Sequence, residues 1–257
     1  MTAILTLWSK HMTKYLIHSE EVIGTLFQPV LWVVLFGLGM ESVMKDLVPG
    51  LNYIAFMVPG IIALTAMSGA IQGGLTFLQE RLLGTMKEYM VAPIPRISIL
   101  MGNALSTTTT ALVQSMVILV VGILMGARLD IFPFGWLGGI LMIIVFSIGF
   151  AGIGLAVAAK ANSTGGYHML IFMLSLPLMF VSNTLYPLSS LPTWMKIIGQ
   201  INPMSYLVDG LRQTIFANSI SASIGQPLEL WLCYVVVIMF SIFGMSMAYF
   251  SFKNAIK

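Results

Sequence analysis

Residues 47–79 read LVPGLNYIAFMVPGIIALTAMSGAIQGGLTFLQ and contain no Asp, Glu, Lys or Arg. Three further stretches also lack formal charge, namely residues 97–127, 131–159 and 161–195. Each of the four runs to about 30 residues, whereas about 20 apolar residues suffice for a helix to cross a hydrocarbon core of roughly 30 Å. Every one of these stretches is therefore long enough to span a membrane.

Two more apolar runs, 22–40 and 230–252, raise the number of expected spans to six. A soluble helical protein would carry polar faces at a period of 3.6 residues, and these runs lack them. Charged residues make up 8% of the chain, against about 25% in soluble domains. Since neither a repeat nor a linker is visible, we expect residues 1–257 to form one all-α integral membrane domain. Its spans are predicted at 22–40, 53–78, 99–125, 134–158, 165–186 and 230–252.

The distribution of positive charge predicts how the chain lies in the membrane. The formal net charge is +3 and no basic block exists, so nucleic acid is not an expected partner. Lys and Arg gather at both termini, in the 79–97 loop and at Lys160. Because these residues accumulate on the cytoplasmic side, we expect both termini to face the cytoplasm, in the cell (cytoplasmic or inner) membrane.

The first residues predict a helix that lies on the membrane rather than in it. Apolar and basic side chains share residues 4–16 in a pattern typical of an amphipathic interfacial helix. The alternative is a frayed cytoplasmic tail. The apolar positions are Ile4, Leu7, Trp8, Met12, Tyr15 and Leu16, and Lys10 and Lys14 lie between them.

Catalytic motifs are missing from the sequence. The three histidines are scattered, no HExxH motif occurs, and no Gly-Lys pair is available for a phosphate loop. We therefore expect neither an enzyme nor a bound cofactor. The expected spans also lack the ionisable residue that proton- or sodium-driven transporters bury near the midplane. Energy is thus expected to enter from outside the membrane domain, through the 79–96 loop.

That loop reads QERLLGTMKEYMVAPIPR, and it resembles the segment between the second and third spans of the ABC-2 transporter permeases. The resemblance implies a short coupling helix seated on an ATP-binding subunit. Thr85 after Gly84 can cap such a helix, and Pro93 stops it before the third span. The expected coupling residues are Glu80, Arg81, Gly84, Thr85, Glu88, Pro93 and Arg96.

Residues 184–212, TLYPLSSLPTWMKIIGQINPMSYLVDGLR, resemble the extracellular segment of the same family. The resemblance implies short helices that re-enter the outer leaflet and gate the exit. Asp209 and Arg212 stand three residues apart and can pair on one helix face, while Asn202 before Pro203 favours a turn. The expected gate residues are Tyr186, Pro187, Pro192, Trp194, Asn202, Pro203, Tyr206, Asp209 and Arg212.

The resemblance covers essentially the whole chain and implies a transport subunit. Two permease copies, expected as a homodimer in membrane lipid, would associate with two ATP-binding cassette subunits that carry the ATP and Mg. The implied activity is export of an amphipathic drug, lipid or lipid-linked glycan. The alternative is an ATP-independent channel or scaffold, in which the 79–96 loop would have no nucleotide-binding partner.

Polar residues at helical spacing mark two stripes, one on the second span and one on the third. Such residues could face cargo in a translocation path, or they could join helices through interhelical hydrogen bonds. The family resemblance places the first, second and fifth spans near the dimer axis, which favours the stripe on the second span. The candidate path residues are Thr65, Ser68, Gln72 and Thr76; Asn103, Thr107, Thr110 and Gln114; and Ser175 and Ser182 on the fifth span.

Overall fold

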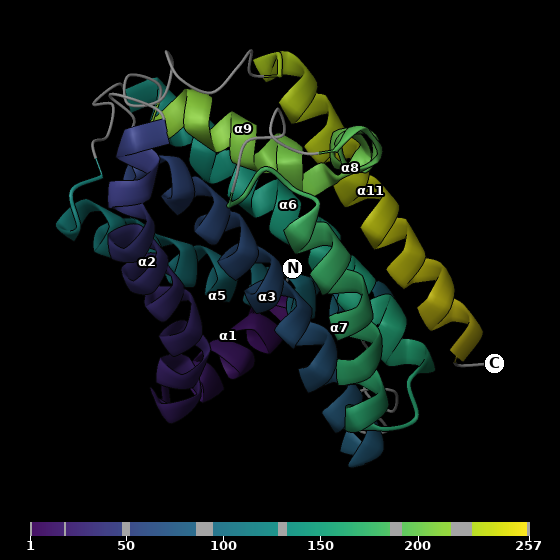
Figure 1. Ribbon diagram of the computed structural model, residues 1–257. Helices are drawn as coiled ribbons and strands as arrows, with labels where there is room; N and C mark the ends of the chain where they lie inside the picture. The colour runs from purple at the N-terminus through teal and green to yellow at the C-terminus, as the bar shows by residue number, and fades with distance from the viewer. Residues whose placement is uncertain are drawn as a thin grey trace.

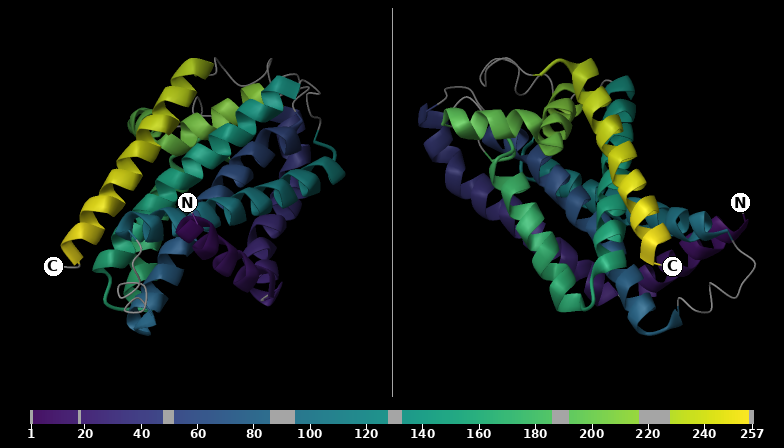
Figure 2. Two further views of the ribbon diagram at one scale, coloured as in Figure 1. Left: turned by 180° about the vertical axis from the view of Figure 1, so that it is seen from behind. Right: turned by 90° about the vertical axis from the view of Figure 1, so that its right-hand side faces the viewer.

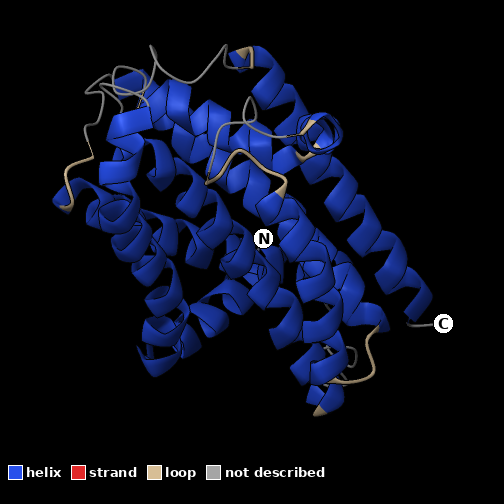
Figure 3. Ribbon diagram, in the orientation of Figure 1, coloured by secondary structure: helices blue, strands red, loops and turns tan. Residues whose placement is uncertain are grey.

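The computed structural model describes residues 2–17, 19–47, 52–85, 95–127, 133–185, 192–216 and 228–255. Within these ranges the chain is helical, with short loops and no strand (Figure 3). The all-α prediction is confirmed for them. The helices are α1 (Thr2–Ile17), α2 (Ser19–Leu47), α3 (Tyr53–Leu82), α5 (Arg96–Leu124), α6 (Pro133–Lys160), α7 (Thr164–Phe180), α8 (Thr193–Ile201), α9 (Pro203–Ile215) and α11 (Leu230–Ala255).

Among the described residues, five helices are long and apolar enough to cross a membrane, namely α2, α3, α5, α6 and α11. They correspond to five of the six predicted spans. The remaining one, predicted at 165–186, corresponds to α7, which is also apolar but has only 17 residues and ends at Phe180. The non-helical segment 181–185 follows α7, and in it the hydroxyls of Ser182 and Thr184 form a hydrogen bond with each other at 2.6 Å. The helix is therefore shorter than the apolar run that predicted it.

Helix α3 lies at the centre of the bundle, where α2, α5, α6, α7 and α9 all contact it (Figure 1). Small residues on successive turns of α3 permit this crowding. A Cβ atom at Gly73 would clash with Thr107 of α5, and one at Gly74 would clash with Gly154 of α6. Close approach of small residues is how helices pack where no hydrophobic force drives them together. The glycines thus place α3 where its side chains can line an internal site.

Helix α6 packs tightly on α11 through glycines on both helices. A Cβ at Gly152 would meet the backbone of Gly244, and one at Gly135 would meet the Thr214 carbonyl of α9. The glycines of α6 therefore serve close packing against α9 and α11. Helix α11 lies on the opposite side of the molecule from α2 (Figure 1).

Two short helices cover one end of the bundle. Figure 2 shows α9 running across this end of the bundle. Asn202 caps α9 by accepting a hydrogen bond from the backbone N–H of Met204 at 3.0 Å, and Pro203 occupies the first turn. The predicted turn at this position is confirmed. Membrane re-entry of α8 and α9 stays a prediction.

Helix α1 packs obliquely on α5 rather than joining the bundle as a further span (Figure 1). The indole of Trp8 donates a hydrogen bond to the Thr109 hydroxyl at 3.1 Å. Leu7 is buried and lies against Gly102, where a Cβ would be 2.9 Å from it. The helix predicted over the first residues is present, and its place at the membrane surface stays a prediction.

Candidate translocation cavity and its two ends

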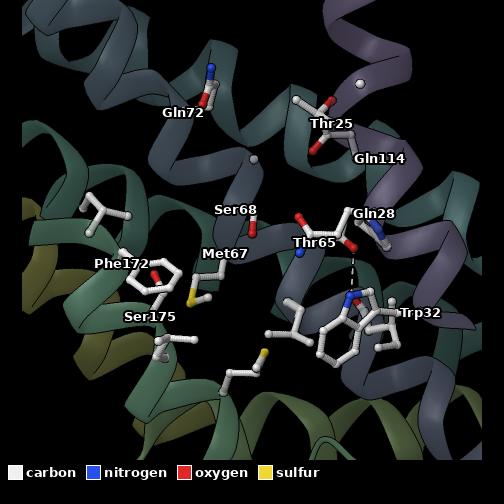
Figure 4. Close-up of a pocket in the computed structure, with 18 of the residues that line it drawn as sticks. Thr25, Gln28, Trp32, Thr65, Met67, Ser68, Gln72, Gln114, Phe172 and Ser175 are labelled. Carbon is white, nitrogen blue, oxygen red and sulfur yellow. Dashed lines mark hydrogen bonds between the residues drawn. The ribbon is translucent and has the colours of Figure 1, made fainter. Parts of the chain in front are cut away.

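A cavity of about 530 Å³ lies between α2, α3 and α7, with one residue from α5 (Figure 4). It extends along most of α7, from His168 near the start of that helix to Met179 near its end. The lining residues are Gly24, Thr25, Gln28, Pro29 and Trp32 of α2, Ile61, Leu64, Thr65, Met67, Ser68, Gly69 and Gln72 of α3, Gln114 of α5, and His168, Ile171, Phe172, Ser175, Leu176 and Met179 of α7.

The predicted stripe on α3 faces this cavity along most of its length. Thr65, Ser68 and Gln72 are all lining residues, and Figure 4 shows them in succession along the helix. The Thr65 hydroxyl also donates to the Ile61 carbonyl at 2.8 Å. Thr76, one turn further, is not among the lining residues and donates to the Gln72 carbonyl at 3.3 Å.

The stripe on α5 mostly serves packing against α3. Asn103 donates to the Gly73 carbonyl of α3 at 3.2 Å. The hydroxyls of Thr107 and Thr110 donate to carbonyls of α5 itself. Only Gln114 of this stripe reaches the cavity. The sequence left both roles open for the two stripes, and the geometry assigns a lining position mainly to α3.

Gln114 joins three helices at the rim of the cavity. Its amide nitrogen lies 3.0 Å from the Thr25 hydroxyl of α2 and 3.4 Å from the Tyr15 hydroxyl of α1. Its amide oxygen occupies the space where a Cβ at Gly69 would stand, 2.6 Å away. Gln114 thereby connects the cavity wall to α1 and α2 through direct hydrogen bonds.

Helix α2 supplies a polar and aromatic wall that the sequence prediction did not include. Thr25, Gln28 and Trp32 stand three and four residues apart on one face of α2. That spacing was visible in the sequence and could have revealed them. On α7 the predicted Ser175 lines the cavity, whereas Ser182 lies beyond the helix and donates to the Met179 carbonyl at 2.8 Å.

A buried arginine fastens the end of the bundle that α9 covers, here called the α9 end. Arg212 is 6% exposed, and its guanidinium donates to the carbonyls of Phe56 in α3 at 3.1 Å and Asn183 at 2.7 Å. It lies 3.4 Å from Asp209 and stacks over the Phe56 ring, 3.8 Å from the ring centroid. The predicted pairing of Asp209 with Arg212 is confirmed. Arg212 thus ties α9, α3 and the segment after α7 together.

Further contacts hold residues 181–185 against the bundle at the α9 end. The Asn183 amide donates to Asp209, and the Asn202 amide donates to the Leu178 carbonyl of α7 at 2.7 Å. Thr184 packs so closely on α3 that a Cβ at Gly60 would be 2.6 Å from it. This buried, non-helical segment closes the bundle next to the end of α7.

The other predicted gate residues lie on or beside α8 and α9. Pro192 precedes α8, Trp194 is 61% exposed on that helix, and the Tyr206 hydroxyl donates to the Gln200 carbonyl at 2.6 Å. Tyr186 and Pro187 lie outside the described residues. Among the described members of the predicted set, Arg212 contacts α3, Asn202 contacts α7, and Asp209 contacts Asn183 in the segment after α7.

At the opposite end of α3, here called the loop end, two charged residues bind to other helices. Glu80 accepts from Lys10 of α1 at 3.2 Å. The guanidinium of Arg81 donates to the carbonyls of Ala159 and Ala161, at the end of α6 and just after it. An arginine is suited to this place because the last carbonyls of a helix have no partners within the helix. Burial lowers the pKa of the neighbouring His11, and the field of Glu80 opposes that shift.

Gly84 lies next to the end of the described range 52–85, and its backbone has a conformation that favours glycine. Its φ is +82°, and its N–H donates to the Arg81 carbonyl at 3.3 Å. Thr85 follows directly. Glu88 and Pro93 lie outside the described residues, as does the side chain of Arg96, the first residue of α5. The predicted coupling helix therefore lies outside the part of the chain that the structure describes.

Comparison with known proteins agrees with this arrangement. The chain is 28% identical over 250 residues to the transport permease ycf38 of Cyanophora paradoxa, covering 92% of this chain and 82% of that relative. It is 28% identical over 226 residues to nodulation protein J of Rhizobium leguminosarum bv. viciae, covering 84% and 83%. It is 24% identical over 216 residues to the inner membrane transport permease YadH of Escherichia coli (strain K12), covering 82% and 81%. A model of the ABC-2 type transporter family matches residues 2–216. The chain therefore belongs to the ABC-2 type transporter family, as a multi-pass membrane protein of the transport-permease kind.

Proposed function

We propose that this chain is the transmembrane subunit of an ATP-driven exporter. The observation that carries the proposal is the cavity between α2, α3 and α7, beside which the α9 end is fastened by Arg212. A cavity next to a closed end is what a protein requires if it takes up cargo on one side and releases it on the other. The α9 end is then extracellular, and the loop end and both termini are cytoplasmic, in the cell membrane.

The nucleotide belongs to a separate subunit in this proposal. Because no Gly-Lys pair is present for a phosphate loop, two ATP-binding cassette subunits would bring ATP and Mg and would dock on the 79–96 loop. A second copy of this chain completes a homodimer. The contacts of Glu80 and Arg81 support this role of the loop, because they link its first residues to α1 and to the turn after α6.

Transport would proceed by alternating access. Closure of the ATPase subunits displaces the loop, and α3 carries the displacement from Glu80 and Arg81 at one end towards Phe56 at the other. Release of the Phe56 carbonyl from Arg212 then opens the α9 end. Cargo that suits the cavity is amphipathic, such as a drug, a lipid or a lipid-linked glycan.

Affinity purification of the tagged permease in mild detergent tests the partner. We expect an ATPase with a Walker motif to copurify in stoichiometric amount, and Gly84→Val or Glu88→Arg to reduce its recovery several-fold. Gly165→Ala is a matched control, because a Cβ there has open space around it. Recovery of a single-component protein would instead support the channel or scaffold alternative.

A further inference from the structure

We propose that the cavity selects uncharged amphiphiles that carry hydroxyl or amide groups, and that it discriminates against both anions and cations. This inference rests on the proposed function and narrows its class of cargo. It excludes cargo that must place a phosphate or an ammonium group inside the cavity. The reasons are the charges that the wall lacks and the polar groups that it offers.

The wall, as the described residues form it, contains no Asp, Glu, Lys or Arg, and its one histidine is His168. The neighbouring charged groups at the α9 end are already engaged with each other, since Arg212 binds Asp209 and two backbone carbonyls. At the loop end, Lys10 pairs with Glu80. A charged cargo would therefore find no oppositely charged side chain in this wall.

A second copy of the chain that presents α2, α3, α5 or α7 to the cavity would not change this conclusion. Between Val22 and Met40 of α2, and along 53–79 of α3, 97–124 of α5 and 164–180 of α7, the sequence has no Asp, Glu, Lys or Arg. Whichever of these helices a partner copy presented, it would add further uncharged wall. Removing a charge from water without a compensating partner is strongly unfavourable, and the same penalty applies to ionisable groups on membrane helices.

The polar groups of the wall fit a neutral ligand instead. Gln28, Ser68 and Gln72 contribute hydroxyl and amide groups, which both donate and accept hydrogen bonds. Figure 4 places Trp32 of α2 and Phe172 of α7 on opposite sides of the cavity. A ligand with a hydroxyl- or amide-bearing edge and a flat or chain-like apolar body would satisfy both kinds of surface.

A matched set of ligands tests the inference. Three fluorescent probes share one twelve-carbon chain and dye and differ only in ending as a carboxamide, a carboxylate or a primary amine. Binding to the permease in zwitterionic lipid nanodiscs is measured at equilibrium, and the signal of empty nanodiscs is subtracted. We expect the carboxamide to bind at least tenfold more tightly than either charged probe, in the wild type and in His168→Gln.

Introducing a charge into the wall should invert this order. Ser68→Asp is expected to raise the affinity for the amine relative to the carboxamide by more than the wild-type preference, so that the amine binds more tightly, and Ser68→Asn is the uncharged control. Gln72→Glu tests the same point one turn along α3 if Ser68→Asp does not fold. Equal or tighter binding of a charged probe to the wild type would overturn the inference, as would an unchanged order in both folded acidic variants.

The binding assay uses the permease alone, so its result does not depend on an ATPase partner. Loss of charge discrimination, together with normal copurification of an ATPase, overturns only the inference about cargo. Failure to recover an ATPase, together with clear preference for the carboxamide, overturns only the proposed energy source. The two proposals therefore fail in distinguishable ways.

Discussion

Helix α3 is held by an arginine at each end, but the two arginines work in different surroundings. Arg212 at the α9 end is 6% exposed and is satisfied by Asp209 and by carbonyls of Phe56 and Asn183. Arg81 at the loop end is only partly buried, and beside it the Lys10 and Glu80 side chains are 49% and 16% exposed. The charged contacts at the α9 end are buried away from water, whereas those at the loop end are partly accessible to water.

The difference in exposure determines what each end can do. An ion pair that water can reach contributes little to the stability of the protein, so little stability is lost when it breaks. A buried pair is costly to break, because the group that remains has no partner. The contacts at the loop end can therefore rearrange more readily than the buried contacts at the α9 end.

The largest effect is expected from Arg212→Met, which leaves the Asp209 carboxylate buried without its cation. We expect a loss of about 3 to 5 kcal/mol in stability, the range for breaking a buried ion pair. Thermal unfolding in detergent, followed by tryptophan fluorescence, measures it. The double variant Asp209→Leu with Arg212→Met should recover part of the loss. If the single variant were as stable as the wild type, the buried contacts of Arg212 would not be what fastens the α9 end.

The next effect concerns the closure of the α9 end by packing. Gly60→Ala places a methyl group 2.6 Å from Thr184 and should cost about 1 to 3 kcal/mol by overpacking. It should also make a cysteine introduced at Ser182 react faster with a membrane-impermeant maleimide in a cysteine-free background. Gly39→Ala is the control, since a Cβ there meets nothing within 4 Å. Equal reaction rates in the two variants would contradict closure by the packing of Thr184 on α3.

At the loop end, Arg81→Ala removes the donor to the carbonyls of Ala159 and Ala161. We expect a smaller loss of about 1 to 2 kcal/mol, near the lower part of the range for hydrogen bonds to charged groups, because water can replace the donor. Arg81→Lys should restore only part, since lysine lacks the planar fork. Hydrogen exchange at the end of α6 reports the local effect, and unchanged protection there would argue against the contact.

The smallest effect is expected from the exposed pair Lys10 and Glu80. Either Lys10→Glu or Glu80→Lys should cost about 1 kcal/mol or less, the typical strength of a surface ion pair. The double exchange should restore stability, and the difference should shrink in high salt. A loss as large as that of Arg212→Met would abolish the distinction between the two ends.

The helical class and the approximate bounds of five spans could be predicted from the sequence, because charge-free apolar runs of this length are typical of membrane-spanning helices. The Asp209–Arg212 pair was also predictable, since a spacing of three residues within one helix determines the contact. That Arg212 reaches Phe56 could not be predicted, because this contact joins residues 156 apart in the chain. Nor could the stripe on α3 be separated from that on α5, because both have helical spacing and only tertiary packing decides which faces the cavity.

The cavity wall on α2 was missed for a related reason. The spacing of Thr25 and Gln28 on one face of α2 is visible in the sequence, but a single span does not show which helices lie opposite that face. Glu80 and Arg81 were predicted from a family motif as residues that couple to an ATPase. The structure places both in contact with the permease itself, and their role towards an ATPase stays a prediction.

The short length of α7 bears on the lipid around it. Its 17 residues rise about 26 Å, less than the roughly 30 Å of a typical hydrocarbon core, while the neighbouring α3 has 30 residues. A bilayer thins or deforms where it meets a helix that is too short. Lipid that meets α7 would therefore be thinned or deformed, at the helix that forms one wall of the cavity. Acyl-chain length in the membrane becomes a variable that can tune how readily this wall moves.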